Sequence, residues 1–348
     1  MKKLKYFLFL SIFLTSNAFV ANALQKDGIK KVIKKEFSVQ PDAKLKLTNS
    51  FGDITCSLWE RNEISVEVTI SADTKSEEAA TKIFSKIEIS FNGTESAVDV
   101  MTKLARNLRS NDHFSIDYNV KMPASVCLDL TNKFGDVMIA ELFSKSAIRV
   151  EYGKASLGKL NFGDNLIEIS FGSASINSIK GSVVILQFSK LRLDYAGSLR
   201  VKSQYSDIEA GEVIVLEGKF EGGEIKLDHT SVLSLDVKFS SFTIGSVKQK
   251  IDLDNQFGSF DVGLVSPDFK SLVIENQHGS VDVCLPKELG YTLDAESHFG
   301  SIKFPQKRAS LSVSTISSQT EIYKGTIGAP STATVKIRNE FGSIKLNP

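Results

Sequence analysis

Histidine and acidic side chains are the residues of this sequence that could bind a metal or catalyse a reaction. A metal site needs several such ligands converging within a few ångströms. His278 stands where similar stretches have phenylalanine, so we interpret it as a replacement for an aromatic ring. His298 has the opposite strand parity, and we expect it in an exposed polar column with Gln277 and Glu340. We therefore predict no metal site and no cofactor.

Acidic residues follow several glycine or serine turns in the N-terminal two thirds of the chain. They are Asp53, Asp136, Asp164 and Asp207. Calcium-binding repeats carry dense Gly-Gly-x-Gly-x-Asp units, whereas here there is a single acid per repeat. Glycan hydrolysis needs two carboxylates at a defined separation, and no such pair stands out from the regular alternation. We interpret these acids as side chains that bond the amides of turns.

Serine and glycine motifs do not indicate catalysis either. The stretch "FGSAS" lacks the Gly-x-Ser-x-Gly pattern of a nucleophilic serine. The stretch "EGKFEGGE" at 217–224 lacks the Lys-Ser/Thr ending of a phosphate-binding loop. The sequence thus predicts no catalytic residue and a protein that is not an enzyme. A glycan-active hydrolase or lyase is kept as an alternative.

The first 23 residues have the layout of a secretory signal peptide. A lysine-rich start, a short apolar run and a small-residue cleavage site occur at Lys2–Lys5, Tyr6–Leu14 and Ala21–Ala23. The apolar run is too short for a membrane span, which takes about 20 residues. No later segment is long and apolar enough for a transmembrane helix. We predict that residues 1–23 are removed and that 24–348 are exported to the periplasm or the cell surface.

Charge and cysteine content narrow the partners and the chemistry. Lys and Arg number 42 and Asp and Glu 41, so the net charge is +1 and no basic surface for nucleic acid is indicated. The cysteines are Cys56, Cys127 and Cys284. Their spacing fits no zinc pattern, and an odd number in an exported protein leaves at least one thiol without a partner in the chain. The parity of its strand places Cys56 inside, whereas disulfide formation stays open.

A short phrase recurs along the chain, as in "NSFGDITC", "NQFGSFDV" and "NEFGSIKL". We call the residue before each Gly or Ser turn the anchor. The anchors are Phe51, Phe134, Tyr152, Phe171, Phe188, Tyr205, Phe220, Phe239, Phe257, His278, Phe299 and Phe341. From Phe134 onward they recur about every 20 residues, a period typical of a solenoid. The last step, from Phe299 to Phe341, is twice as long as the one before it, and we interpret it as two steps with Thr320 at the missing anchor.

Each repeat contains two strands joined by a corner. In "IDLDNQFGSFDVGL" apolar residues alternate at period two, and their parity switches at the Gly-Ser pair. The pattern predicts an all-β fold, a single parallel right-handed β-solenoid of about a dozen short coils. Stacking then forms two corner ladders, an aromatic one inside the wall and an amide one beside it. Their residues are Phe51, Phe134, Phe171, Phe257, His278, Phe299 and Phe341, and Asn49, Asn132, Asn255, Asn276 and Asn339.

An insertion at about 71–122 interrupts the rhythm. Thr74 and Glu77 have the spacing of a capping box, which predicts a helix over Thr74–Lys86. Strands are expected at Ser96–Thr102 and Phe114–Met122. The sequence shows no evident C-terminal cap.

The chain resembles a group of bacterial families of unknown function called "putative adhesins", which include the head GIN type. The resemblance is carried by "GDITCSLWERNEISVEVTI", by "YNVKMPASVCLDLTNKFGDV" and by the serial "FGSI"-like corners, from about residue 35 onward. It implies a β-solenoid on an exported or surface-exposed protein.

These observations predict a non-catalytic protein of the cell envelope. A repetitive surface suits adhesion or scaffolding, with surface glycans, envelope proteins or further copies of the chain as partners. A periplasmic stress or signalling accessory with one protein partner is an alternative.

Overall fold

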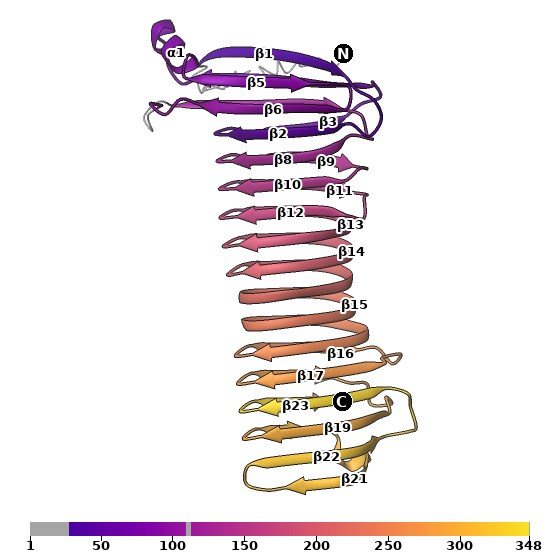
Figure 1. Ribbon diagram of the computed structural model, residues 1–348. Coiled ribbons are helices and arrows are strands. Elements are labelled where there is room, and N and C mark those ends of the chain that lie inside the picture. The colour runs from indigo at the N-terminus through magenta and orange to yellow at the C-terminus, as the bar shows by residue number, and fades with distance from the viewer. Residues whose placement is uncertain (1–27, 109–112, 348) are drawn as a thin grey trace, which may run out of the picture.

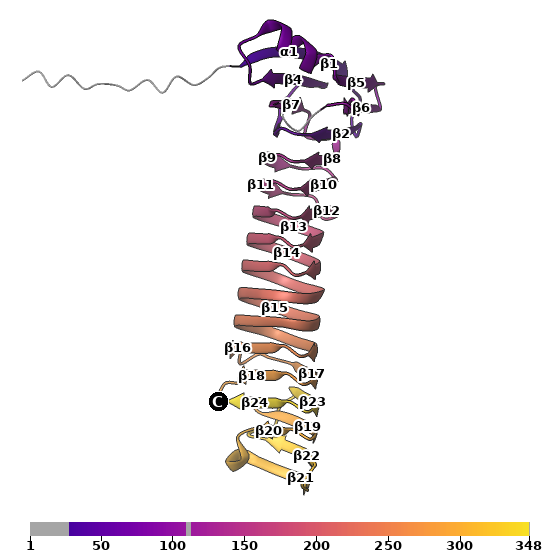
Figure 2. The ribbon, with the colours of Figure 1, turned by 90° about the vertical axis from the view of Figure 1, so that its left-hand side faces the viewer.

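The computed structural model describes residues 28–108 and 113–347. The predicted signal peptide lies outside these residues. The described chain is nearly all β with one helix, and it forms a long stack of strands (Figures 1 and 2). An all-β fold with one helix near the N-terminus is thus confirmed.

The strands fall into three groups along the stack. The N-terminal group contains β1 (Ile29–Ser38), β2 (Lys44–Ser50), β3 (Ile54–Leu58), β4 (Glu63–Ala72), β5 (Ile87–Gly93), β6 (Ala97–Leu104) and β7 (Phe114–Met122), with α1 (Glu77–Phe84) after β4. The middle group contains β8 (Cys127–Lys133), β9 (Val137–Leu142), β10 (Ser146–Glu151), β11 (Lys154–Leu160), β12 (Asn165–Ser170), β13 (Ser173–Gln187), β14 (Lys190–Gln204) and β15 (Asp207–Gln256). The C-terminal group contains β16 (Ser259–Val265), β17 (Ser271–Gln277), β18 (Ser280–Cys284), β19 (Tyr291–His298), β20 (Ser301–Lys303), β21 (Ala309–Ile316), β22 (Thr320–Ile327), β23 (Thr334–Glu340) and β24 (Ser343–Asn347).

Two walls of strands face each other across the core (Figure 2). The first wall is made of the strands that lead into the anchors, β2, β8, β10, β12, β17, β23 and β19, with the matching parts of β13, β14 and β15. The second wall is made of the strands that leave the anchors, β3, β9, β11, β16, β18, β24 and β20, with the other parts of β13, β14 and β15. We call a rung the unit made of two consecutive strands, one in each wall, and the corner that joins them.

Successive rungs of the middle group pair in parallel. Ser146 lies opposite Leu128, Leu166 opposite Ala147 and Val215 opposite Ser198, so the chain advances from rung to rung by a short and nearly constant step. Strand β15, 50 residues long, bends through several rungs as one continuous strand. The step is the one that the repeated corners predict.

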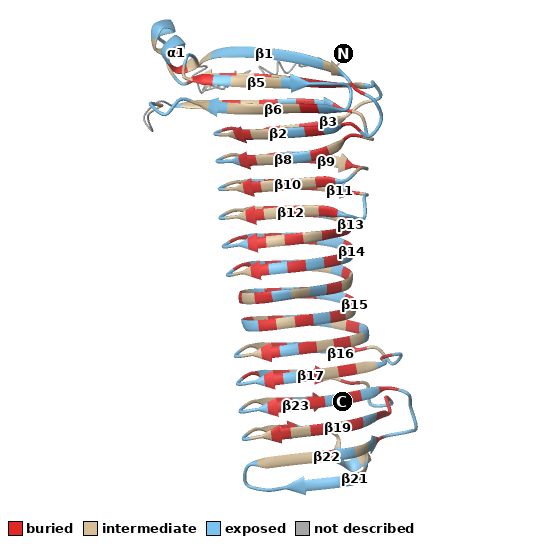
Figure 3. Cartoon of the chain, viewed as in Figure 1, coloured by how far each residue is buried: buried red, intermediate tan, exposed pale blue. Residues whose placement is uncertain are grey.

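Alternation at period two creates one continuous core between the walls (Figure 3). On the first wall Ile148, Ile167 and Val184 lie opposite one another with no exposed surface. Burying one aliphatic side chain of this size contributes about 1.5–3 kcal/mol. Because each rung repeats this burial only against its neighbours, stability accumulates along the stack.

The N-terminal end departs from parallel pairing. β1 pairs with β4 and β4 with β7 in antiparallel fashion, which extends the second wall, and β5 pairs antiparallel with β6 on the first. The sheet is therefore mixed, and the expectation of parallel pairing throughout does not hold at this end.

The helix is shorter than predicted and begins at a different cap. It runs over Glu77–Phe84 rather than Thr74–Lys86, and Ser76 is its N-cap because its Oγ accepts a hydrogen bond from the Ala79 amide at 3.3 Å. Thr74 instead accepts a hydrogen bond from the Ser76 amide at 3.1 Å, so the predicted capping box is wrong.

The C-terminal rungs are not stacked in chain order. β23 lies between β17 and β19 and pairs in parallel with both, and β24 likewise lies between β18 and β20. The chain passes from β20 through the antiparallel strands β21 and β22 before it returns to this place (Figure 1). The two-step interpretation of the last interval is wrong, because Thr320 lies opposite His298 in an antiparallel pair.

The β21–β22 hairpin forms the C-terminal cap that the sequence did not reveal. Tyr323 of β22 packs edge-on against Phe304 with ring centroids 4.9 Å apart, which covers that end of the core. The carboxylate of Glu321 accepts a hydrogen bond from the Ile302 amide at 3.0 Å, at the edge of β20. Side chains thus take the place that a further rung would occupy.

Strand order gives a first prediction. Removing residues 334–348, which carry β23 and β24, should separate β19–β22 from the rest of the stack. We expect amides of β19 and β22 to lose hydrogen-exchange protection, whereas amides of β10, β12 and β14 keep theirs, because rungs contact only their neighbours. Retained protection in β19 would show that it can pair with β17 directly and would contradict this order.

Candidate functional site

The anchors have a backbone conformation that is rare for large side chains. Phe51, Phe134, Tyr152, Phe171, Phe188, Tyr205, Phe239, Phe257, His278, Phe299 and Phe341 all have positive φ, between 47° and 65°. Such left-handed geometry costs about 1–2 kcal/mol for a residue other than glycine. It also turns each side chain outward, and the aromatic anchors are 39–62% exposed, with Phe51 and Phe239 at the extremes. The expectation of rings inside the wall is therefore wrong.

The outward rings stack along the axis in two series. The first series contains Phe51, Phe134, Tyr152, Phe171, Phe188 and Tyr205, with neighbouring centroids 4.9–5.3 Å apart. The second contains Phe239, Phe257, His278, Phe341 and Phe299, at 4.8–5.2 Å. In the second series His278 contacts Phe341 rather than Phe299, because β23 lies between β17 and β19. Each stacked pair contributes about 0.5–1.5 kcal/mol, which offsets the backbone cost.

Gly222 separates the two series. It has φ +72° and is the anchor of its rung, midway in sequence between Tyr205 and Phe239. Phe220, which the sequence pattern takes as the anchor, is 2% exposed and points into the core. The Tyr205 ring leans over the missing side chain, since a Cβ on Gly222 would lie 2.7 Å from its Cδ1.

Stacking leaves little ring face for a ligand. Interplanar angles of 2–13° place the rings of each series face to face, so mainly their edges meet solvent. Sugar recognition by an aromatic side chain uses the face. We therefore assign these rings to corner geometry rather than to ligand binding.

A buried amide ladder runs inside the corner of the C-terminal rungs. The Asn255 side-chain amide donates to Asn276 Oδ1 at 2.7 Å, Asn276 donates to Asn339 Oδ1 at 2.7 Å, and Asn339 donates to Ser297 Oγ at 2.8 Å. All four side chains are at most 2% exposed. Each asparagine also donates to a glycine carbonyl three residues ahead, at 2.9–3.2 Å. Asn339 stands between Asn276 and Ser297 in this ladder because its strand, β23, lies between β17 and β19.

The asparagines at the N-terminal corners do not form such a ladder with each other. Asn49 donates to the Ile116 carbonyl at 2.9 Å and accepts from the Thr102 hydroxyl at 2.8 Å. Asn132 donates to the Gly52 carbonyl at 2.9 Å. Asn49 and Asn132 lie on neighbouring rungs, but their side-chain bonds run to other groups.

The acids after the corners tie neighbouring rungs together. Asp53 accepts a hydrogen bond from the Asp136 amide at 2.8 Å, and Asp136 accepts one from the Lys154 amide at 2.8 Å. Asp207 likewise accepts from the Glu224 amide at 3.1 Å, while Asp164 pairs with Lys145. The carboxylates of Asp53, Asp136 and Asp207 thus bond an amide of the next rung, a partner that sequence spacing alone did not identify.

Histidine and cysteine side chains are dispersed. His278 belongs to the ring stack, and His298 lies 2.9 Å from a Glu296 carboxylate oxygen and 3.2 Å from the Thr320 hydroxyl. Burial raises the pKa of the Cys56 thiol to about 12, which suppresses the reactive thiolate. Residues 28–108 and 113–347 hold no group of three or more His, Cys, Asp or Glu side chains placed to bind a metal.

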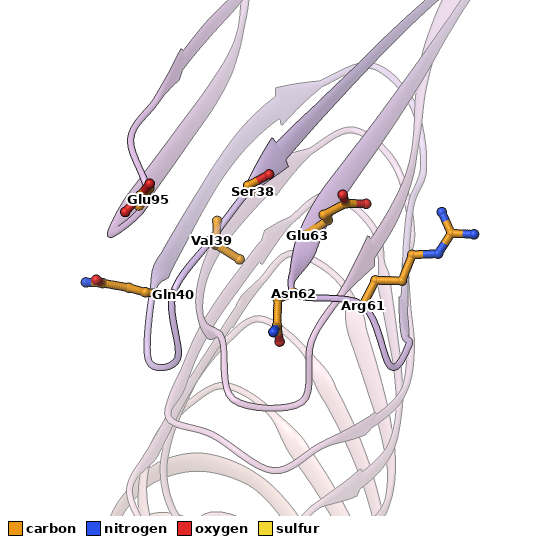
Figure 4. Close-up of a pocket in the computed structure, with 7 residues that line it drawn as sticks. All are labelled: Ser38, Val39, Gln40, Arg61, Asn62, Glu63 and Glu95. Atoms are coloured by element: carbon orange, nitrogen blue, oxygen red, sulfur yellow. The ribbon is translucent and has the colours of Figure 1, made fainter.

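A polar hollow of about 620 Å³ opens at the N-terminal end (Figure 4). It is lined by Ser38, Val39, Gln40, Arg61, Asn62, Glu63 and Glu95. In Figure 4 the Gln40 and Arg61 side chains point to opposite sides rather than toward a common centre. Arg61 also lies over the Trp59 ring, 5.1 Å from its centroid, which holds it at the rim. The arrangement offers no converging pair of acids.

A longer groove follows the outer surface of the first wall. Two neighbouring hollows of about 520 and 590 Å³ share Val183 as a lining residue and together extend from β2 to β15. Their outward apolar residues Ala147, Leu166 and Val183 lie directly opposite one another on β10, β12 and β13. We call this surface, with the charged residues beside it, the first-wall groove. Those charged residues are Lys44, Asp129, Lys145, Arg149, Asp164, Arg200, Lys202, Glu217, Lys219, Asp236, Asp252 and Asp254.

Charges along the first-wall groove are largely paired across rungs. Arg149 lies 2.6 Å from Asp129 and 3.2 Å from Glu168, so it bridges three strands. Arg200 pairs with Glu217 at 3.1 Å and Lys219 with Asp236 at 3.0 Å. Exposed pairs of this kind contribute only about 0–1 kcal/mol, so a polar ligand can exchange them for its own bonds at little cost.

Comparison with known proteins leaves the family open. No family model and no curated protein matches the chain. Among solved structures, a "putative adhesin" from Bacteroides fragilis is 10% identical and one from Parabacteroides distasonis 11%. The first covers 90% of this chain and 96% of its own with a TM-score of 0.33, the second 92% and 98% with 0.31. A "putative lipid binding protein" from Parabacteroides distasonis is 11% identical, with 91% and 97% covered and a TM-score of 0.26. These structures are distant from this chain in sequence and in shape.

The ring stack gives a second prediction, which compares alanine and glycine at one anchor. Phe171→Ala keeps the left-handed backbone but loses two ring stacks, so we expect a loss of about 1–3 kcal/mol in the free energy of unfolding. Phe171→Gly relieves the backbone and should be about 1 kcal/mol less destabilising than the alanine variant. Urea denaturation measures both. Phe162→Ala is the control, because Phe162 is 40% exposed yet outside the stack, and equal losses at both sites would refute a role for stacking.

The amide ladder gives a third prediction. A Cβ on Gly279 would lie 2.3 Å from Asn255 Nδ2 and 2.7 Å from Asn276 Oδ1. Gly279→Ala must therefore displace the ladder, and we expect a loss of about 1–3 kcal/mol in unfolding free energy. Gly163→Ala is the matched control, because its Cβ would meet no atom within 4 Å. A Gly279→Ala protein as stable as the control would show that the ladder yields without cost.

Proposed function

We propose that this protein is a non-catalytic, exported β-solenoid that binds an extended polymer at the cell envelope, as an adhesin or an interaction scaffold. The observation that carries the proposal is the first-wall groove. It is open, spans several rungs and combines an apolar floor with charged rims. A shallow surface of this length suits a chain-like ligand, such as a surface glycan or an extended peptide, better than a small molecule, which needs an enclosing cavity.

Periodicity supports the same function. Equivalent outward side chains recur at each rung, so a polymer with its own repeat can form many similar weak contacts at once. Linked weak contacts give an overall affinity far above that of any single one. The acids of the groove each have a bonding partner, as Asp236 has Lys219 and Asp252 has Lys250 at 3.1 Å, which favours binding over acid–base chemistry.

Binding by the groove is tested with a panel of purified bacterial surface polysaccharides. We expect the protein to retain one or more of them without releasing reducing ends. The double variant Ala147→Lys/Val183→Lys should weaken retention by about tenfold, since it places two cations on the apolar floor. Met138→Lys is the control, because Met138 is 46% exposed on β9 of the second wall. Release of reducing ends would overturn the non-catalytic proposal, and equal retention by both variants would exclude the groove.

Export is tested separately by cell fractionation with protease added to intact cells. Cleavage on intact cells is the outcome expected for an adhesin. A protein that is protected on intact cells but cleaved after the outer envelope is opened would exclude adhesion to other cells and favour the envelope-accessory role. A protein that stays in the cytoplasm would contradict the proposal that it is exported. In the part of the chain that the structure describes, no helix is long and apolar enough to cross a membrane.

A further inference from the structure

The two ends of the stack protect their strand edges differently. Among the described residues, β1 and β5 are the edge strands at the N-terminal end and β20 and β21 at the other. β1 carries four lysines within ten residues, a composition that discourages a further strand from pairing. β5 follows α1, which packs against it, and carries Glu88. β20 is three residues long, and the amide of its middle residue, Ile302, donates a hydrogen bond to Glu321.

β21 has none of these protections along its whole length. Its sequence "ASLSVSTI" contains no charge and no proline. It pairs with β22 on one side, and no strand of the described chain pairs with its other side. Val313 is 39% exposed and Ile316 66%. A strand edge of this kind presents unpaired amides and carbonyls to another chain.

A bulge limits the usable part of this edge. The register with β22 shifts between Leu311 and Val313, and the Ser312 hydroxyl donates to the Lys324 carbonyl at 3.1 Å. A bulge bends a strand and disturbs further pairing at its position. From Val313 to Ile316 the register is regular again, opposite residues 321–324 of β22. These four residues are the segment to which a strand can be added.

We propose that the Val313–Ile316 edge of β21 joins two copies of this chain end to end, through antiparallel pairing about a twofold axis perpendicular to the sheet. This symmetry places residues of the same face opposite each other. With the axis at Thr315, Thr315 lies opposite Thr315 of the second copy on one face, and Ser314 lies opposite Ile316 on the other. β-Branched and hydroxyl side chains are favourable cross-strand partners, and the uncharged strand brings no like charges together. The proposal gives the scaffold function above a defined partner, but it does not depend on ligand binding in the groove.

The position of β21 favours a second copy over other occupants. It is the last strand at one end of the stack, so a copy joined there would extend the stack lengthwise (Figures 1 and 2). At the opposite end of the stack, the lysines of β1 would repel the β1 lysines of a second copy. Because the described chain has a single open edge of this type, association closes at the dimer and does not continue into a filament. Four residues on each side form a small contact, so we expect a dissociation constant on the order of 0.1 mM.

The test is sedimentation velocity with small-angle scattering, on the full mature chain without ligand, from about 10 µM to 1 mM, a range that brackets this affinity. We expect a concentration-dependent dimer whose longest dimension is about twice that of the monomer. Thr315→Lys places two lysines near the twofold axis and should abolish the dimer. Thr326→Lys is the matched control, because Thr326 is an exposed residue of β22, one strand away from the edge, and should leave the dimer intact.

Three results would overturn the proposal. They are a monomer at every concentration, a dimer that persists in Thr315→Lys, and a dimer no longer than the monomer, which would mean side-by-side association. Far-ultraviolet circular dichroism verifies that both variants fold. Polysaccharide retention measured on monomeric Thr315→Lys separates failure of the dimer from failure of the groove.

Discussion

The close approach of successive corners governs this molecule. A Cβ on Gly135 would lie 2.0 Å from the Gly52 carbonyl oxygen, and a Cβ on Gly153 would lie 2.0 Å from the Gly135 carbonyl oxygen. Only glycine fits at such a contact. Where the position after the anchor is serine, its hydroxyl bonds the corner instead, as Ser206 does with the Gln204 carbonyl at 2.8 Å. The anchor before it is forced into left-handed geometry, and stacking of its ring on the next rung offsets that cost.

The inside of the corner has a matching rule. Asparagine stands three residues before glycine at each of its ladder positions, as Asn276 stands before Gly279, because the amide fills the space that a Cβ would need. In the middle rungs the same inward position holds apolar residues such as Val150 and Leu186. The asparagine corners therefore lie toward both ends of the stack, and the corners in its middle are apolar except at Ser203, which is 1% exposed. The alternation of buried and exposed residues along the strands is thus the same in each rung, whereas the residue inside the corner differs between rungs.

Several features could be predicted from the sequence because they depend on period alone. Alternation at period two and a turn about every 20 residues indicate strands and corners, and the structure is nearly all β with one helix. Parity also places Phe257 with Ile251 and Leu253 inside the wall, but positive φ turns its ring outward, and no letter pattern encodes that reversal. The sequence pattern likewise takes Phe220 as an anchor in place of Gly222, because each of the two residues stands shortly before a glycine. The groove could not be foreseen, because Ala147, Leu166 and Val183 become neighbours only through the register of three strands.

Placement of the β23–β24 rung between two others affects how the stack can come apart. The end rung of a stack has one neighbour and can peel away, and the rungs behind it then follow one by one. β23 instead has a parallel partner on each side, β17 and β19. To release it, the sheet must break along two ladders at once, or the β19–β22 segment must detach first. Stepwise unfolding that starts at the C-terminal residues of the chain is therefore blocked, although the same end of the stack can still open from its outermost strands, β21 and β22.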